Sequence, residues 1–275
     1  MFLDDEIEVV RPDVRRGRFR SVLFDFDGTL SLIREGWPQV MIPMMTAVLR
    51  ETRTTETDAQ LTAVVEEFVM RLTGRQTIYQ MVQLADEVRR RGGIPLEPLA
   101  YKNRYHDLLM ERIRGRLDAL ASGAAAKPDE WTVPGSHALL EALRQRGLIL
   151  YLASGTDLKY VRREAELLGV AEYFGEHIYG AVDEYKTFSK QMIVERILRD
   201  HALHGEELLG FGDGFVEIEE VKKYGGCAVA VASDEANRRG VDAWKRDRLL
   251  KAGADLVIPD YRRADRLLAY LFAEA

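Results

Sequence analysis

Hydrophobic positions recur along this chain with two different periods, and the change between them divides it into parts. From residue 37 to about residue 121 they lie three and four positions apart, as on one face of an α-helix. The clearest stripe consists of Leu61, Val64, Val65, Phe68, Val69 and Leu72. Thr57 or Asp58 could cap the start of this helix, and further helices are expected over 78–88 and after residue 98. The pattern predicts a block of helices.

After Pro134-Gly135 the pattern changes to short apolar runs that alternate with helix-like segments, which is typical of a parallel sheet. One strand-like run, Val22-Leu23-Phe24, comes earlier and precedes the helical block. The block is therefore expected to be inserted into an α/β core. We predict a doubly wound parallel-sheet core at residues 1–33 and 128–275 and a helical domain at 34–127. The strand-like runs are 148–153, 208–211, 228–232 and 256–258, and the helix-like segments are 139–146, 158–168, 192–199 and 264–272.

The composition indicates a folded protein and disfavours some functions. With 275 residues, of which 47% are hydrophobic, the chain can bury a sizeable core. Its 45 acidic and 39 basic residues give a net charge of -6, which disfavours nucleic-acid binding as the main task. Cys227 is the single cysteine, so an internal disulfide is excluded and a reducing, cytoplasmic setting is expected.

The apolar runs and the first twenty residues predict no membrane association. No run approaches the roughly 18 apolar residues of a membrane span, so a soluble protein is expected. Residues 1–20 mix acids with arginines and lack the apolar segment of a signal peptide. We expect a solvated arm there, in which residues 7–10 could add an edge strand. Oligomeric state cannot be deduced from the sequence.

The string Phe24-Asp25-Phe26-Asp27-Gly28-Thr29-Leu30 is the strongest candidate for chemistry. It places two carboxylates two residues apart where an apolar strand ends in a glycine turn. Open α/β folds bind ligands at this carboxyl edge of the sheet. Two acids there repel each other unless a cation lies between them. Asp27-Gly28 alone would be read as an ordinary turn, but the whole string is far more specific.

This string resembles the first motif of the haloacid dehalogenase (HAD) superfamily, which consists largely of phosphatases and phosphotransferases. The resemblance implies that Asp25 is the nucleophile and takes the phosphoryl group as an aspartyl phosphate. Asp27 would protonate the leaving oxygen and later deprotonate water. The inserted helices are similar to the helical cap of the first class in this superfamily, as in phosphoglycolate phosphatases.

Two further segments are similar to the second and third HAD motifs. The run 152–156 places the Ser154 hydroxyl and the backbone around Gly155 at a strand-to-helix turn that would bind phosphate. The alternative is that Thr156 or Asp157 simply caps a helix. Lys190 and Lys186 compete for the role of phosphate-facing cation. We prefer Lys190, because Ser189 can cap the helix that would hold it and because its spacing to Asp213 suits the family better.

The segment 210–217 resembles the fourth HAD motif and implies a metal site. Asp213 would bind Mg²⁺ together with Asp25 and Asp27, and Glu217 stands where the family more often has an aspartate, so its role is open. Magnesium prefers oxygen ligands and bridges carboxylates to phosphate. Zinc is not expected, because the five histidines and the cysteine show no ligand spacing.

The resemblance implies a magnesium-dependent phosphatase acting on a small phosphorylated metabolite, such as a sugar phosphate or a phosphoglycolate-like compound. A phosphomutase with the same nucleophile and a non-catalytic binding protein on this fold are the alternatives; a dehalogenase fits the acids less well. Arg34 and Arg75 are candidates for contact with an anionic or hydroxylated substrate. The competing interpretation, which we favour for both, is an exposed surface charge.

Overall fold

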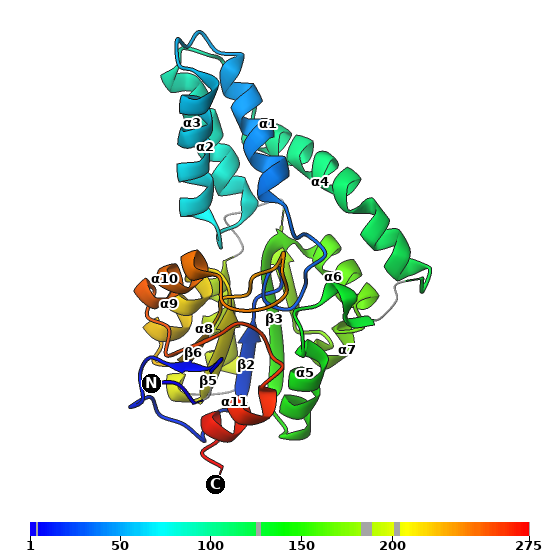
Figure 1. Ribbon diagram of the computed structural model, residues 1–275, viewed down its shortest axis with the longest axis vertical. Coiled ribbons are helices and arrows are strands. Elements are labelled where there is room, and N and C mark those ends of the chain that lie inside the picture. Colours follow the sequence, from blue (N-terminus) through cyan, green and yellow to red (C-terminus); the bar gives the residue numbers. More distant parts are fainter. Residues whose placement is uncertain (4, 125–127, 183–188, 201–203, 275) are drawn as a thin grey trace. The chain divides into compact units, whose positions relative to one another are not determined.

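The computed structural model describes residues 1–3, 5–124, 128–182, 189–200 and 204–274 (Figure 1). The chain divides into two compact units, an α/β unit of residues 1–35 with 116–275 and a helical unit of residues 36–115. The expected limits of the helical part were 34 and 127. The second differs because the α/β unit already includes the end of helix α4 (Pro98–Ala121), where the Arg116 guanidinium donates to the carbonyls of Ile33 at 2.7 Å and Glu35 at 2.8 Å.

A seven-stranded sheet with the order β1-β7-β6-β5-β2-β3-β4 forms the centre of the α/β unit in the described ranges. Neighbouring strands run parallel, except that β1 is antiparallel to β7. From β2 the chain winds outward to β3 and β4, and then returns to the other side of β2 with β5, β6 and β7. The winding thus reverses between β2 and β5. The strands are β1 (Glu8–Val9), β2 (Ser21–Phe24), β3 (Ile149–Asp157), β4 (Ile178–Ala181), β5 (Leu208–Gly212), β6 (Cys227–Val231) and β7 (Leu256–Ile258).

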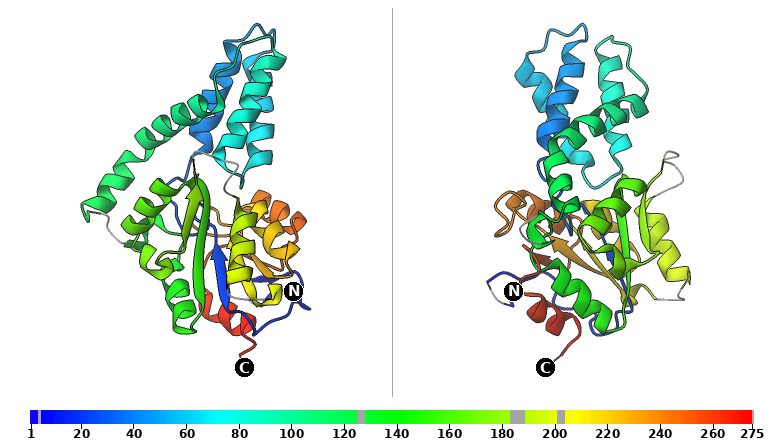
Figure 2. Two further views of the ribbon diagram at one scale, coloured as in Figure 1. Left: turned by 180° about the vertical axis from the view of Figure 1, so that it is seen from behind. Right: turned by 90° about the vertical axis from the view of Figure 1, so that its right-hand side faces the viewer.

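Helices cover both faces of this sheet, as the doubly wound prediction requires (Figure 2). Leu23 of β2 belongs to the apolar cluster that includes Ile193 of α8 and Val221 of α9. Its neighbour Phe24 points to the other face, where its ring contacts that of Phe174 in α7 edge to face. The helices are α5 (Ser136–Gln145), α6 (Leu158–Leu167), α7 (Ala171–Phe174), α8 (Lys190–Asp200), α9 (Phe215–Lys223), α10 (Ala243–Lys251) and α11 (Ala264–Leu271), with 3-10 turns η1 (Pro128–Trp131) and η3 (Gly205–Glu207).

The helical unit contains α1 (Pro38–Arg50), α2 (Asp58–Leu72), α3 (Thr77–Arg90) and most of α4. The predicted stripe forms the buried face of α2, since Leu61, Val65 and Phe68 are at most 1% exposed. Thr57 caps this helix, as expected: its Oγ1 accepts from the backbone N–H of Gln60 at 3.3 Å, and the Gln60 side chain accepts from the Thr57 N–H. Residues 125–127, the expected end of the helical domain, lie outside the described residues.

The first twenty residues are only partly a solvated arm. The expected edge strand is present as β1, and the side chains of Ile7, Val9 and Phe19 are buried. Apolar side chains that could pack against the unit override the charged composition of this segment. Among the described residues, no helix has both the length and the apolar character needed to cross a bilayer.

Candidate active site

The carboxylates of the first and fourth motifs follow two neighbouring strands. Strand β2 ends directly before Asp25, and β5 ends directly before Asp213. In the parallel register Phe24 lies opposite Phe211, and the Asp25 N–H donates to the Phe211 carbonyl at 3.0 Å. The winding reverses between these two strands, and open α/β sheets bind ligands beyond the carboxyl ends of the strands at such a point. The fold alone therefore marks this edge as a site.

Asp25 is buried among charged groups, with 6% of the residue exposed. Its Oδ1 accepts a hydrogen bond from Nζ of Lys190 at 2.8 Å. Burial raises the pKa of Asp25 to about 7, Lys190 opposes this, and the negative charge of Asp213 adds to it. Asp25 and Asp213 therefore interact electrostatically, and a cation beside them would favour the ionised form of Asp25.

Lys190 is held between two acids at the start of α8. As predicted, Ser189 caps the helix, since its Oγ accepts from the Met192 N–H at 3.2 Å. Nζ of Lys190 also contacts Oε1 of Glu217, which is 1% exposed. The Glu217 carboxylate is thus an ion-pair partner of Lys190. Its expected part in metal binding stays a prediction. The competing candidate, Lys186, lies outside the described residues.

Asp27 accepts hydrogen bonds from two hydroxyls of the second motif. Its Oδ2 receives Oγ1 of Thr156 at 2.9 Å and Oγ of Ser154 at 3.3 Å. Strand β3 extends through these residues and Gly155, beyond its expected end at 153, whereas Asp157 takes the N-cap position of α6 without a side-chain hydrogen bond that caps the helix. Thr156 is therefore a site residue and not a helix cap. Its place in the motif was the signal that could have identified it.

Gly28 and Thr29 of the first motif pack closely against Asp213 of the fourth motif. Gly28 has φ +75°, and a Cβ at this position would overlap the Asp213 carboxylate. Thr29 Oγ1 accepts from the Asp213 N–H at 3.0 Å and donates to its Oδ1 at 3.4 Å. Tyr261 in turn donates its hydroxyl to the Thr29 carbonyl at 2.9 Å. A side chain at position 28 would push Asp213 away, which is why the motif needs glycine here.

A second lysine, which the sequence analysis missed, contacts Asp213. Nζ of Lys245 in α10 lies 2.9 Å from Oδ2 of Asp213 and 2.6 Å from Oε1 of Glu235. Ser233 Oγ lies 3.4 Å from the same Nζ and donates to the Gly28 carbonyl at 2.9 Å. The surrounding acids raise the pKa of Lys245 despite its burial. No motif in the sequence marks Lys245 or Glu235.

Arg34 is buried, so its interpretation as an exposed surface charge is wrong. The residue is 8% exposed, and its Nε and Nη2 bind the Glu164 carboxylate, with Nη2 to Oε1 at 2.6 Å. Its Nε also lies 3.7 Å from Oδ1 of Asp27. Glu164 lies on the inner face of α6 and attracts the guanidinium inward. Arg75 is exposed, in the turn between α2 and α3 of the helical unit.

Oxygen ligands suited to magnesium occur at this edge of the sheet. Among the described residues, no group of three or more His, Cys, Asp and Glu side chains is arranged to hold a metal ion. Magnesium needs fewer protein ligands, because it usually binds one or two carboxylates and keeps waters and substrate oxygens. Asp25 and Asp213, which follow adjacent strand ends, carry carboxylates that would supply two such ligands. The donor set therefore fits Mg²⁺.

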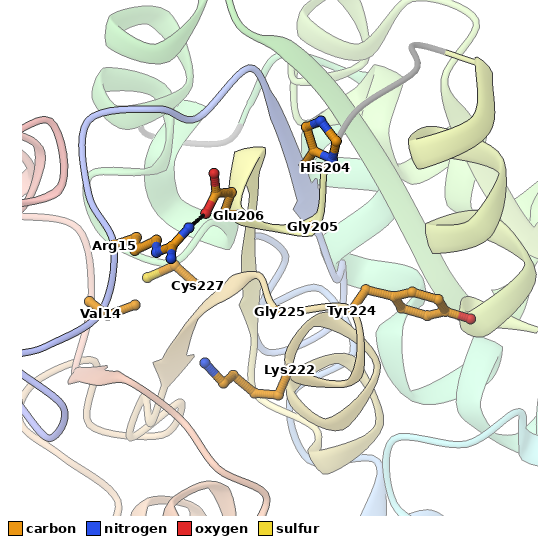
Figure 3. A pocket seen from close by; sticks show the side chains of 9 residues that line it. All are labelled: Val14, Arg15, His204, Gly205, Glu206, Lys222, Tyr224, Gly225 and Cys227. Atoms are coloured by element: carbon orange, nitrogen blue, oxygen red, sulfur yellow. Dashed lines mark hydrogen bonds and ion pairs between the residues drawn. The ribbon is translucent and has the colours of Figure 1, made fainter.

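A polar pocket lies elsewhere, where β5 and β6 begin (Figure 3). Gly205 and Glu206 of its lining precede β5, and Cys227 is the first residue of β6. Arg15 in its wall is paired with Glu206, and Lys222 donates to Asp255 at 2.8 Å. These residues lie at the amino ends of the strands, so the pocket is separate from the carboxylate site.

The fold and the site together define an α/β protein of the doubly wound type with an acidic centre at the point where the winding reverses. The sequence model of the haloacid dehalogenase-like hydrolases matches residues 19–225. The chain therefore belongs to this family of hydrolases, as its first motif predicted. No curated protein matches the sequence significantly.

Solved structures share the fold at low sequence identity. A predicted phosphoglycolate phosphatase from Haemophilus somnus is 16% identical, with a TM-score of 0.61 over 91% of this chain and 98% of that one. A β-phosphoglucomutase from Clostridium difficile is 12% identical, with a TM-score of 0.60 over 93% and 98%. A HAD family hydrolase from Deinococcus radiodurans with bound phosphate and sodium is 17% identical, with a TM-score of 0.53 over 92% and 96%.

Proposed function

We propose that this chain is a magnesium-dependent phosphatase that cleaves a small phosphorylated metabolite through an aspartyl phosphate on Asp25. One observation carries the proposal: a buried aspartate at the switch point of the sheet is paired at 2.8 Å with Lys190, and the strand beside it ends directly before Asp213. A carboxylate in this position can act as a nucleophile only if its charge and that of the substrate are both compensated.

In the first half of the reaction, a carboxylate oxygen of Asp25 attacks phosphorus and the ester P–O bond breaks. Asp27 gives a proton to the leaving oxygen, so that an alcohol departs and not an alkoxide. Thr156 and Ser154 donate to Oδ2 of Asp27 and hold the carboxyl group in place. Lys190, which is paired with Asp25, also attracts the phosphoryl oxygens. The products are the free alcohol and an aspartyl phosphate.

In the second half, water attacks the phosphorus of the aspartyl phosphate. Asp27, now ionised, takes a proton from this water, the bond between phosphorus and the Asp25 oxygen breaks, and inorganic phosphate leaves. Each catalytic group returns to its first protonation state. Mg²⁺ held by Asp25 and Asp213 would supply the positive charge that lets an anionic carboxylate approach an anionic phosphoester. The same proposal includes Gly155 as a further phosphate ligand and Glu217 as a further metal ligand.

The substrate class is a phosphorylated compound of small size. A sugar phosphate or a phosphoglycolate-like compound is favoured, because the similar proteins include a predicted phosphoglycolate phosphatase and a hydrolase with bound phosphate. Arg34, beside Asp27, and Arg75 remain candidates for substrate contact. A cytoplasmic setting agrees with the single buried cysteine.

A panel of phosphorylated metabolites, assayed for phosphate release with and without Mg²⁺, tests the proposal. Phosphate release that requires Mg²⁺ and disappears in Asp25→Asn is expected. Activity of Asp25→Asn at the level of the wild type would exclude Asp25 as the nucleophile. Formation of an isomeric phosphate ester without released phosphate would instead support a phosphomutase, an activity found in a protein of similar fold. No turnover of any compound would favour a binding protein.

A further inference from the structure

Lys245 occupies a position in this site that the proposed chemistry does not explain. It projects from the first turn of α10 between two carboxylates, Asp213 after β5 and Glu235 after β6. The three side chains are 12%, 14% and 19% exposed, so water screens their charges only partly. Lys245 is therefore a fixed positive charge beside an oxygen that the proposed metal would also use.

Lys245 is not needed to orient Asp213. Thr29 already holds the Asp213 residue at two points, the backbone N–H at 3.0 Å and Oδ1 at 3.4 Å. Gly28 adds a close steric boundary on the other carboxylate oxygen. The contact with Lys245 is on this second oxygen, Oδ2, at 2.9 Å. Its main consequence is thus electrostatic, since an ammonium group at this distance opposes any further cation on the same oxygen.

Glu235 gives Lys245 a second partner. Its Oε1 is 2.6 Å from Nζ, closer than Oδ2 of Asp213 at 2.9 Å. The Ser233 hydroxyl connects this loop to the first motif through the Gly28 carbonyl. When a cation takes Asp213, the ammonium can stay paired with Glu235 and is not left as a buried unpaired charge, which would be costly.

We propose that Lys245 competes with the divalent cation for Asp213 and that Glu235 relieves this competition by retaining the displaced ammonium. The two residues would together set the affinity of the site for Mg²⁺. This inference rests on the proposed function, because it takes Asp213 as a metal ligand. Lys245 and Glu235 would control metal binding and would take no direct part in the reaction.

Titration of Mg²⁺ into the EDTA-treated 275-residue chain, monitored by calorimetry, tests the proposal without an activity assay. Lys245→Met keeps the volume of the side chain and removes its charge, and should lower the Kd for Mg²⁺ at least about tenfold. Glu235→Gln removes the charge of the second partner, so the Lys245 ammonium pairs with Asp213 alone. The Kd for Mg²⁺ should then rise about threefold or more. Lys251→Met, an exposed lysine at the end of the same helix, is the matched control and should leave the Kd unchanged.

The double variant separates competition from direct ligation. If Glu235 acts only through Lys245, adding Glu235→Gln to Lys245→Met changes the Kd less than about twofold. A clear further loss of affinity would show that Glu235 is itself a ligand and would overturn the proposal. Weaker binding in Lys245→Met, with its folding confirmed by circular dichroism, would overturn it too. If Lys245→Met fails to fold, Glu235→Gln still tests the proposal, because an unchanged or lower Kd refutes competition.

The same titration separates failure of this inference from failure of the proposed function. Asp213→Asn should bind Mg²⁺ at least about tenfold more weakly than the wild type if Asp213 is a ligand. If Mg²⁺ binding is lost in Asp213→Asn but unaffected by Lys245→Met, the competition is refuted and the proposed function is not. Absence of Mg²⁺ binding in the wild type and in all variants sinks both. Binding that appears only in Lys245→Met would support the competition in its strongest form.

Discussion

Nζ of Lys190 lies 2.8 Å from Oδ1 of Asp25 and at the same time contacts Oε1 of Glu217. Lys245 stands in a similar relation to Asp213 and Glu235. Each aspartate after a strand end thus contacts a lysine from a helix later in the chain. Each lysine also contacts a second acid, Glu217 or Glu235. The second acid reduces the net positive charge that the lysine presents, so its removal is expected to tighten the lysine on its aspartate.

Lys190→Met should lower phosphate release from the best substrate by ~10²- to 10³-fold, the size of effect seen when one preorganised charge-stabilising donor is removed. The loss is expected in kcat, because Lys190 is aimed at the atoms that react. Lys223→Met, on α9 with a half-exposed side chain, is the control and should keep full activity. Steady-state kinetics of both variants measure the difference. Equal kcat values in Lys190→Met and the wild type would remove Lys190 from the site and return attention to Lys186.

Gly28→Ala should move Asp213 and impair the enzyme more than it impairs the fold. A Cβ at Gly28 overlaps the Asp213 carboxylate, whereas one at Gly92, which has a similar φ of +70°, meets nothing within 4 Å. Both substitutions therefore carry the same backbone strain, about 1 to 2 kcal/mol in free energy of unfolding. Only Gly28→Ala should lower kcat/KM, by roughly 10²-fold, since small misplacements of reacting groups have such effects. Denaturant unfolding and kinetics on the two variants provide the comparison.

Local patterns were sufficient to predict most of the fold and one half of the site. The stripe on α2 and the strand before Asp25 depend on neighbours within the same segment, so their periodicity is visible in the sequence. Ser189 as a helix cap is equally local. Asp25, Asp27, Ser154 and Asp213 could be placed because each stands in a string with a specific pattern at a strand end.

The other half of the site depends on contacts between distant segments. Arg34 was interpreted as exposed because nothing near it in sequence predicts the buried Glu164 on α6, which lies opposite it in space. Lys245 and Glu235 follow the matched motifs and look like ordinary loop and helix charges. The extension of β3 through Thr156 was missed because a serine, a glycine and a threonine in a row favour a turn locally. In the fold, pairing of Asp157 with Ala181 of β4 outweighs this preference.

Asp25→Asn should raise the stability of the protein at alkaline pH in EDTA while it abolishes turnover. Burial raises the pKa of Asp25 to about 7 in the folded protein from 3.8, so the wild type loses stability as the pH rises from about 4 through 7. The variant has no such penalty. Its melting temperature should exceed that of the wild type at pH 8, and the difference should shrink as the pH falls below 7 and vanish near pH 4. A difference that grows on acidification would contradict the raised pKa.

The buried pair of Arg34 and Glu164 should be costly to break and cheap to replace. Glu164→Gln removes the closest counterion of a buried guanidinium, which keeps only the Asp27 carboxylate at 3.7 Å, and should lower the free energy of unfolding by about 3 kcal/mol. Arg34→Met with Glu164→Leu removes both charges and should recover most of this stability. The exposed pair of Glu67 and Arg71 on α2 is the control, and its loss should cost only about 0.3 to 0.5 kcal/mol.

Activity of the double variant then decides what Arg34 does. If the arginine beside Asp27 contacts the substrate, the stable variant without it should show a raised KM for anionic substrates, at least about tenfold. If Arg34 serves only to neutralise Glu164, the variant should have the KM and kcat of the wild type. Kinetics and denaturant unfolding on the same preparation keep the two effects apart, because a loss of folded protein lowers the apparent kcat and leaves KM unchanged.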